Sequence, residues 1–349
     1  MSGSTLLIVV FAMAAGAIVI IACVRVIWRL TGLYLIRRAG PRRVRAKRHV
    51  LWRDPKRAEE RDLAAGPGGP GSEPAPPFTF LEEHSSGSSP SLSVRDARGR
   101  RWRVKWGEEV QSETFAVRLA WAVGYFAEVT HYVAQGTIEG AKDLQRATEC
   151  LDEQGRFAEA RFELEDAHAH THWEEHSWAW NDNPFVGTRE LNGLKILVML
   201  LSNWDSKDQR DVARGSNTAI FEYTSGWRRE ARYLITDWGG SMGRWGTYPV
   251  TRANWDPDAF EAQTPKFITG VSADGVVQFG YVGQRTADVS EGIRVEDVRW
   301  IHSFLSRLTR RQLLDALRAS GASAEEAERY AVALEQRIEQ LGDVANGKG

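Results

Sequence analysis

An uninterrupted apolar run near the N-terminus constrains this chain more than any other feature of its sequence. Residues 6–24 read LLIVVFAMAAGAIVIIACV and contain no charged or strongly polar side chain. A helix rises about 1.5 Å per residue, so a run of this length just spans a hydrocarbon core of roughly 30 Å. The sequence therefore predicts one transmembrane anchor, which we place at residues 5–30.

The charges on either side of this run predict its orientation. Only MSGST precedes it, whereas residues 25–62 are strongly basic. Basic residues beside a spanning helix stay on the cytoplasmic side of the membrane. We therefore expect a single-pass protein of the cell membrane with a cytoplasmic soluble domain. The lipid bilayer is the expected partner of the helix and its basic flank, in place of nucleic acid.

Three other interpretations of the apolar run remain open. A cleaved signal peptide would need a basic n-region, which is missing here. Residues 20–23, IIAC, loosely resemble a bacterial lipobox, although the positive flank directly after Cys23 argues against lipidation on the outer side. A buried helix of a soluble protein would normally show a polar face, and this run has none.

The rest of the chain has the composition of an ordinary globular protein. Its two cysteines, Cys23 and Cys150, are too few for a disulfide framework, which suits a reducing compartment. Residues 31–77 combine the basic segment with a Gly/Pro-rich stretch at 64–77, which we expect to be a flexible linker. A folded domain should then extend from residue 78 to 342, followed by a frayed tail at 343–349.

Hydrophobic spacing predicts the fold class of this domain. Short β-prone runs and a hairpin signal are followed by helical patterns and a second hairpin. The expected strands are residues 78–81, 92–95, 102–106, 218–222 and 232–236, and the expected helices are 108–124, 189–203 and several after 295. This order predicts an α+β, two-lobed domain, with a strand-rich N-lobe at 78–125 and a helical C-lobe at 126–342.

A set of polar residues stands at the boundaries of these elements. Phosphoryl transfer from ATP needs a lysine on the phosphates, a carboxylate that holds the lysine, an aspartate near the acceptor hydroxyl and ligands for magnesium. The chain offers these residue types in the order Lys105, Glu109 or Glu113, Asp205, Asn217 and Asp237. Taken singly, each has a plainer interpretation, since a strand lysine is usually solvated and a loop aspartate usually belongs to a turn.

At these residues the chain resembles the atypical protein-kinase-like superfamily, which includes the HipA-type kinases and the phosphatidylinositol kinases. Residues 200–205, LLSNWD, resemble its Asn-x-Asp catalytic loop, and residues 234–239, LITDWG, resemble its Asp-x-Gly metal turn. Residues 104–113, VKWGEEVQSE, look like its strand lysine and helix glutamate. The resemblance covers residues 78–245. It implies a two-lobed protein-kinase-like domain that uses ATP and Mg²⁺ to phosphorylate a protein, lipid or small-molecule hydroxyl.

The resemblance also implies roles for individual residues. Lys105 would bind the α- and β-phosphates, and Glu113 would pair with it, with Glu109 one helical turn earlier as the rival. Asp205 would orient or deprotonate the acceptor. The serine-rich loop that contains Ser86, Gly87 and Ser88 would cover the phosphates.

The metal ligands depart from the usual pattern. Asp237 and Asn217 would hold magnesium, but conventional kinases place the metal-binding Asn five positions after the catalytic Asp, where Arg210 stands here. Asn217 is the natural substitute because it lies just before a strand, and Asp208 could also serve. This departure leaves open a pseudokinase-like scaffold that binds a nucleotide or partner without turnover.

A histidine-rich segment offers a further alternative. His168, His170, His172 and His176 lie in EDAHAHTHWEEHSW, and the first three alternate as residues on one face of a strand would. Neutral imidazoles so placed could bind zinc, copper or nickel. An exposed hairpin rich in histidine is the competing interpretation.

Overall fold

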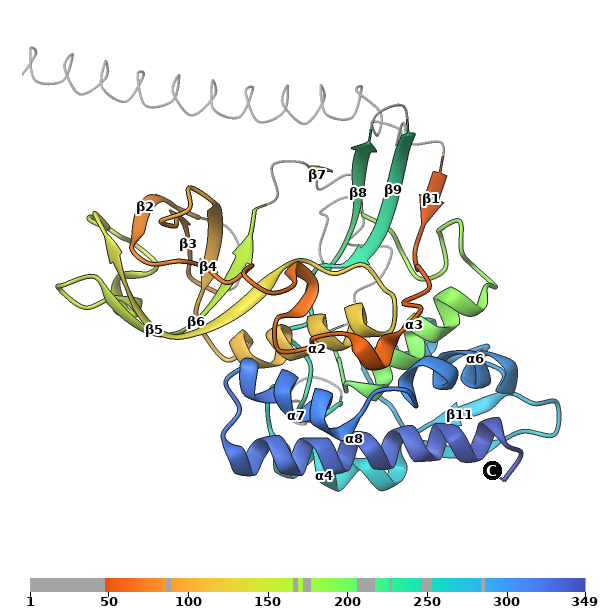
Figure 1. Ribbon diagram of the computed structural model, residues 1–349. Coiled ribbons are helices and arrows are strands. Elements are labelled where there is room, and N and C mark those ends of the chain that lie inside the picture. Colours follow the sequence, from red (N-terminus) through yellow and green to blue (C-terminus); the bar gives the residue numbers. More distant parts are fainter. Residues whose placement is uncertain are drawn as a thin grey trace, which may run out of the picture. The chain divides into compact units, whose positions relative to one another are not determined.

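Residues 48–85, 89–165, 169–171, 177–205, 217–225, 228–246, 253–283 and 286–348 are described in the computed structural model of this chain. They all belong to one unit, Val44–Gly349. Within this unit a β-barrel lies beside a helical region, and one helix, α2 (Val110–Ala122), packs against both (Figure 1).

The strands predicted at residues 78–106 belong to a closed five-stranded barrel. Its strands are β2 (Phe78–Glu83), β3 (Ser91–Arg95), β4 (Arg101–Lys105), β5 (Thr130–Glu139) and β6 (Arg156–Leu164). They follow the order β2-β3-β4-β6-β5, and the parallel pairing of β2 with β5 closes the ring. The N-lobe is therefore longer than the sequence indicated, because β5 and β6 continue it from residue 125 to residue 164.

Alternation along the strands gives the barrel an apolar interior. Trp102, Val104 and Phe162 are fully buried and pack together inside it. The residues between them in sequence point to the other face, because successive side chains of a strand alternate. On β4 the alternate positions are Arg101, Arg103 and Lys105, so this strand has one apolar and one cationic face.

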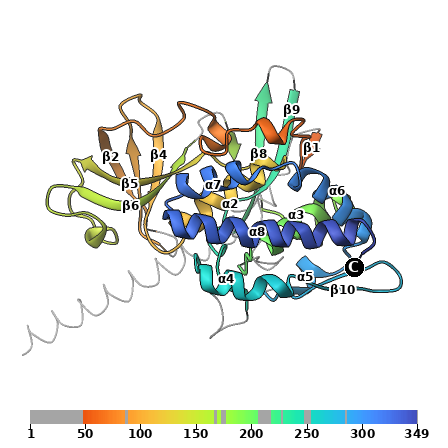
Figure 2. The same cartoon turned by 60° about the horizontal axis from the view of Figure 1, so that its bottom comes forward.

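The helical region packs around a second, larger core. It contains α3 (Arg189–Leu200), α4 (Pro257–Gln263), α5 (Thr286–Ser290), α6 (Val295–Leu305), α7 (Arg310–Ala319) and α8 (Ala324–Ala345). Figure 2 shows α8 lying across α4, α6 and α7, all of which it contacts. A capping box begins α8, because the Ser323 hydroxyl and the Glu326 carboxylate each accept a hydrogen bond from the other residue's backbone N–H.

Two hairpins accompany these helices. β8 (Thr218–Ser225) and β9 (Arg228–Ile235) form the hairpin expected before Asp237, and β10 (Ile268–Val271) pairs with β11 (Val277–Phe279). The first hairpin belongs to a sheet of order β1-β9-β8-β7, with β1 at Arg48–Val50 and β7 at Ala169–Thr171.

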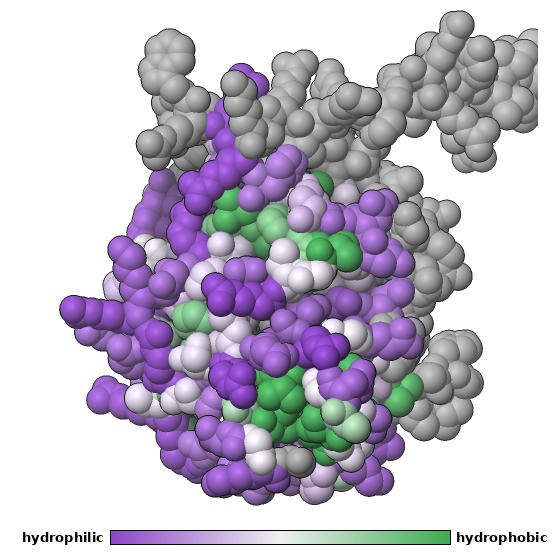
Figure 3. Space-filling view, turned by 90° about the vertical axis from the view of Figure 1, so that its right-hand side faces the viewer, coloured by the Kyte–Doolittle hydropathy of each residue, from purple (hydrophilic) through white to green (hydrophobic). Residues whose placement is uncertain are grey.

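On the face seen in Figure 3, a mostly hydrophilic surface is broken by separate hydrophobic patches.

Residues 48–77, which we call the N-terminal arm, differ from the expected flexible linker. The arm begins with β1, which pairs in parallel with β9, and contains the short 3-10 helices η1 (Ala58–Glu60) and η2 (Gly66–Gly68). The side-chain amide of Gln312 on α7 donates 2.9 Å hydrogen bonds to the carbonyls of Ala58 and Arg61. The arm is therefore part of the fold, and the folded domain includes residues 48–77.

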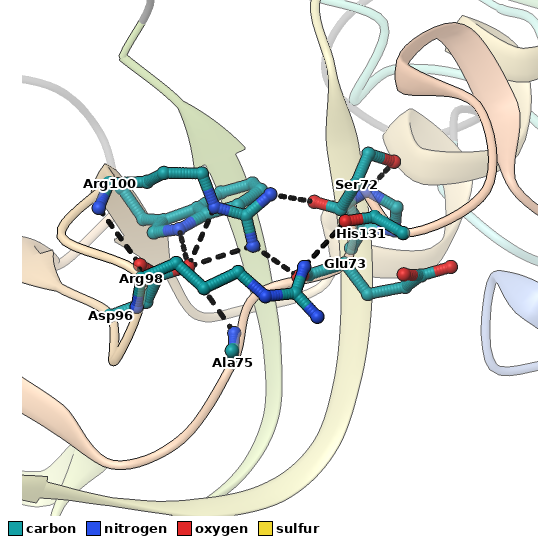
Figure 4. Close-up of polar contacts among 9 residues, drawn as sticks. Ser72, Glu73, Ala75, Asp96, Arg98, Arg100 and His131 are labelled. Atoms are coloured by element: carbon teal, nitrogen blue, oxygen red, sulfur yellow. Dashed lines mark hydrogen bonds and ion pairs between the residues drawn. The ribbon is translucent and has the colours of Figure 1, made fainter.

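The far end of the arm is held against the barrel (Figure 4). Arg100 donates to the Ser72 carbonyl at 2.9 Å, and Arg98 donates to the Gly71 carbonyl at 2.5 Å. The Ser72 hydroxyl lies 3.1 Å from Nε2 of the buried His131. These partners explain why a segment rich in glycine and proline is ordered: side chains of the barrel satisfy its backbone carbonyls.

The predicted membrane anchor requires a correction. Among the described residues, no helix combines the length and the apolar character that crossing a bilayer demands. We therefore correct the fold class of the described residues to an α+β domain that contains no membrane-spanning helix, and the structure does not support the single-pass membrane location. The apolar run at 5–30 itself lies outside the described residues.

Candidate functional site

Lys105 occupies the last position of β4, on the polar face of the barrel. It lies directly opposite Ser91 on β3 and Arg161 on β6. The positive charge of Arg161 and then burial lower the pKa of Lys105, while Asp237, Glu163 and Glu109 act in the opposite direction. Lys105 has no hydrogen bond or ion pair within the described part of the chain.

Two glutamates of α2 lie beside this lysine and differ in their partners. Glu109 stands just before the helix, and burial followed by the charge of Asp237 raises its pKa. Glu113 is 2% exposed and forms an ion pair with the equally buried Arg161. The pairing of Glu113 with Lys105 is therefore corrected, because Arg161 takes Glu113. Of the two, Glu109 is the one whose charge acts on Lys105, together with Asp237 and Glu163.

The loop after α3 carries the candidate catalytic aspartate. Ser202 turns the chain with a left-handed φ of 57°, and the buried Asn203 then accepts a hydrogen bond of 3.1 Å from the backbone N–H of Asp205. Asn217, just before β8, donates from Nδ2 to the Asp205 carbonyl at 2.5 Å. The two asparagines thus hold the backbone of Asp205 from both sides.

Asp237 follows β9 in a tight turn that reaches the same place. Its Oδ1 accepts from the backbone N–H of Gly239 at 3.0 Å, and its carbonyl accepts from Nδ2 of Asn203 at 3.4 Å. The Ser112 hydroxyl on α2 donates to the Gly239 carbonyl at 2.8 Å. A Cβ atom at position 239 would lie 2.7 Å from the Glu109 carboxyl carbon, so the close approach of turn and helix requires glycine.

Three of these carboxylates form a group that could hold a cation. One oxygen atom from each of Glu109, Glu113 and Asp237 lies within 4.8 Å of the others. Hard divalent cations such as Mg²⁺ take carboxylate oxygens as ligands, so the donor set fits magnesium. Glu113 is already paired with Arg161. Asp237 and Glu109 are therefore the better ligands of the three.

The helical region supports the loop of Asp205 from beneath. The guanidinium of Arg337 on α8 is fully buried and donates to the Leu200 carbonyl at 2.8 Å and to the Ser202 hydroxyl at 2.9 Å. The Tyr281 hydroxyl donates to the Asn203 carbonyl at 2.5 Å. A rigid support of this kind is what a site needs in order to keep reacting groups in place.

The site accordingly gathers most of the residues that the sequence singled out. Lys105, Glu109, Glu113, Asp205, Asn217 and Asp237 come together from the barrel, α2, the loop after α3 and both ends of the β8–β9 hairpin. The predicted phosphate-covering residues Ser86, Gly87 and Ser88 and the alternative ligand Asp208 lie outside the described residues. So do His168, His172 and His176, whereas the backbone of His170 is in β7.

Sequence reasoning missed four polar residues of the site. Arg161 and Glu163 project from β6 and are joined by a 2.8 Å ion pair, and Ser91 is buried opposite Lys105. Burial and the charge of Glu163 raise the pKa of Glu128 well above its usual range. The alternation of residues 160–163 was a usable signal, since a strand with Ala160 and Phe162 inside the barrel turns Arg161 and Glu163 toward the site.

Comparison with known proteins adds no family assignment. No protein-family model matches the sequence, and a search of curated proteins finds no significant relative.

Proposed function

We propose that this protein is an atypical kinase, which transfers the γ-phosphoryl group of ATP to a hydroxyl of an acceptor still to be identified. One observation carries the proposal: charged residues from separate elements meet at one place, in the chain order that phosphoryl transfer uses. Burial raises the pKa of Glu109 most, and the charges of Asp237, Lys105 and Asp205 also act on it.

The geometry supports a role for each group. Protein kinases carry the phosphate-binding lysine on the third strand and its glutamate on the following helix. Lys105 ends the third strand of the barrel, and α2 follows it with Glu109 at its start. Lys105 would therefore bind the phosphates of ATP, with Glu109 as the residue that orients it.

Asp205 and Asp237 would have the two remaining roles, proton acceptance and magnesium binding. Asp205, whose backbone is held by Asn203 and Asn217, would accept the proton of the acceptor hydroxyl. Asp237 and Glu109 provide carboxylate oxygens that would hold Mg²⁺, and Asn217, whose Nδ2 bonds the Asp205 carbonyl, would add its amide oxygen. When bound, Mg²⁺ would neutralise charge on the transferred phosphoryl group.

A nucleotide-binding scaffold without turnover is the second candidate. The observation that favours it is the buried pair of Arg161 and Glu113, which takes one of the two helix glutamates away from Lys105. A protein of this kind would keep the affinity for ATP and lose the transfer step.

The test combines ATP binding with ATP turnover in the full-length protein. We expect ATP with Mg²⁺ to raise the melting temperature of the wild type, and we expect Asp205→Asn to keep this shift while losing at least about 100-fold in turnover, as for the loss of a general base. Asp237→Asn should lose the Mg²⁺-dependent part of the shift. Asp143→Asn, at an exposed loop position, is the matched control and should behave as the wild type.

The outcomes separate the two candidates. Binding of ATP without any turnover that depends on Asp205 favours the scaffold. If ATP with Mg²⁺ shifts neither the wild type nor the Lys105→Ala protein, both nucleotide-based functions are excluded.

A further inference from the structure

Three potential hydrogen-bond donors lie side by side across the polar face of the barrel. Ser91 on β3 is directly opposite Lys105 on β4, and Lys105 is directly opposite Arg161 on β6. Residues opposite each other in antiparallel strands share one face, with Cβ atoms about 5 Å apart. The three side chains therefore form a continuous row, which we call the donor row.

Two members of the donor row, Ser91 and Arg161, are buried and Lys105 is half-buried, and much of the row's hydrogen-bonding capacity is unused. Ser91 is 1% exposed and Arg161 is 2% exposed. Neither the Ser91 hydroxyl nor Nε of Arg161 has a hydrogen-bond partner among the described residues, and Lys105 also has none there. Buried polar groups without partners are uncommon and costly, so two of them on either side of Lys105 point to a ligand that completes their bonding.

The next row along the same strands provides a contrast. Ser93 is opposite Arg103, which is opposite Glu163. Ser93 is as buried as Ser91, but its hydroxyl donates to Glu165 at 2.9 Å and lies 2.9 Å from Nε2 of His84. Nε of Arg103 in this row also lacks a partner among the described residues, so the contrast lies in the serines: described groups bond the Ser93 hydroxyl, and none bonds the Ser91 hydroxyl.

The charges of the donor row define the chemistry of its ligand. Lys105 and Arg161 place two cations next to each other, and only Arg161 has carboxylate partners, Glu113 and Glu163. A tetrahedral oxyanion accepts several hydrogen bonds at once and relieves the repulsion between neighbouring cations. A neutral ligand would supply acceptors without relieving that repulsion.

We infer that Ser91, Lys105 and Arg161 form a phosphate-binding subsite, in which Ser91 and Nε of Arg161 donate to the same phosphate group as Lys105. The inference rests on the proposed function for the identity of the bound molecule, a nucleotide polyphosphate. It goes beyond that function because it adds two phosphate-binding residues, Ser91 and Arg161, to which the kinase resemblance assigns no role. The subsite would fix the phosphate chain along β3, β4 and β6.

The experiment measures binding of inorganic tripolyphosphate to the full-length protein by titration calorimetry, with no nucleotide present. Ser91→Ala should weaken binding about 10-fold or more, as for the loss of one hydrogen bond to a charged group. It should leave the unfolding midpoint of the free protein unchanged, because no described group bonds the Ser91 hydroxyl. Ser93→Ala is the matched control, and it should lower the midpoint but keep the wild-type affinity.

A second variant guards against an indirect effect of the serine. Arg161→Lys keeps a cation beside Glu113 and removes Nε, so we expect it to weaken tripolyphosphate binding while the protein remains folded. Exposed Arg95, on the same sheet, is the control for charge, and Arg95→Gln should bind as the wild type does.

The failures of the two proposals are distinguishable. Equal affinity of Ser91→Ala and wild type, or no binding of tripolyphosphate to the wild type, overturns the phosphate subsite even if ATP is hydrolysed. Loss of affinity in Ser91→Ala with no turnover of ATP supports the subsite and leaves the kinase function unsupported.

Discussion

His131 shows at the scale of one residue how the barrel sets the properties of a buried group. Its imidazole lies edge-on to the Trp102 ring and 3.1 Å from the Ser72 hydroxyl. Burial, followed by the positive charges of Arg118 and Arg100, lowers its pKa to about 3. The histidine is therefore neutral in the folded protein over the whole physiological range.

This lowered pKa makes stability depend on pH in a defined window. An unfolded histidine titrates near 6.5, so between pH 6.5 and 3 the unfolded chain binds a proton that the folded protein does not. The contribution of neutral His131 is complete above pH 6.5 and is lost as the pH falls toward 3. We expect the stability of the wild type to fall relative to His131→Gln by up to about 1.4 kcal/mol per pH unit in this window.

The measurement is urea denaturation of both proteins between pH 4.5 and 7.5. Glutamine can still bond Ser72 but does not titrate, so carboxylates that titrate in the same range cancel in the difference. A difference in unfolding free energy that stays constant across these pH values would contradict the assignment to His131.

At the scale of elements, the sequence predicted those helices, turns and caps that depend on residues close together in the chain. The helix at Arg189–Leu200, the turn between β3 and β4 and the capping box of α8 all follow from residues a few positions apart. Partners far apart in sequence were not predictable in this way. Glu113 pairs with Arg161 because the register of β4 against β6 brings that arginine beside α2, and no local pattern encodes this register.

The N-terminal arm illustrates the same limit. Its composition is that of a linker, and the groups that order it lie in the turn between β3 and β4, in α7 and in β9. The composition of a segment indicates whether it can form a hydrophobic core of its own. It does not indicate whether side chains far away in the sequence will hydrogen-bond its backbone N–H and C=O groups.

The contact between the arm and α7 leads to a prediction for Gln312. Its Oε1 accepts from the backbone N–H of Thr309 at 2.9 Å in a capping box, and its amide donates to the arm. Gln312→Glu keeps the cap and replaces the donor with a carboxylate that faces two carbonyls. We expect a loss of about 1–3 kcal/mol in unfolding free energy and faster cleavage by trypsin after Arg57 and Arg61.

Gln336→Glu is the control for this variant, because it makes the same change at an exposed position of α8. Equal trypsin cleavage rates of the arm in the two variants would mean that Gln312 does not hold it.

At the scale of the whole molecule, the candidate site depends on parts of the chain that never touch a ligand. The barrel supplies Lys105, but the position of Asp205 is set by the helical region through Leu200 and Ser202. The final helix, α8, reaches this loop through one side chain, Arg337. The last element of the chain therefore supports a loop more than a hundred residues before it.

Arg337 makes these hydrogen bonds to the loop of Asp205, and it has no carboxylate partner among the described residues. Burial lowers its pKa well below the usual value. Its guanidinium carbon lies 3.6 Å from the centre of the Phe260 ring, and its nitrogens also donate to the Phe260 carbonyl at 2.9 Å and the Thr264 hydroxyl at 3.0 Å. Carbonyls, hydroxyls and an aromatic face together replace a counter-ion.

Removing this guanidinium should affect stability and the site together. Arg337→Met fills similar volume but leaves the Leu200 and Phe260 carbonyls without their partner, so we expect a loss of at least about 2 kcal/mol in unfolding free energy. The loop of Asp205 loses its support at the same time, so ATP turnover should fall further than ATP binding. Arg329→Met, on the more exposed side of α8, should cost no more than about 1 kcal/mol and leave turnover unchanged. The measurements are the unfolding free energy and the rate of ATP turnover of both variants. If both quantities were equal in the two variants, α8 would not position the loop.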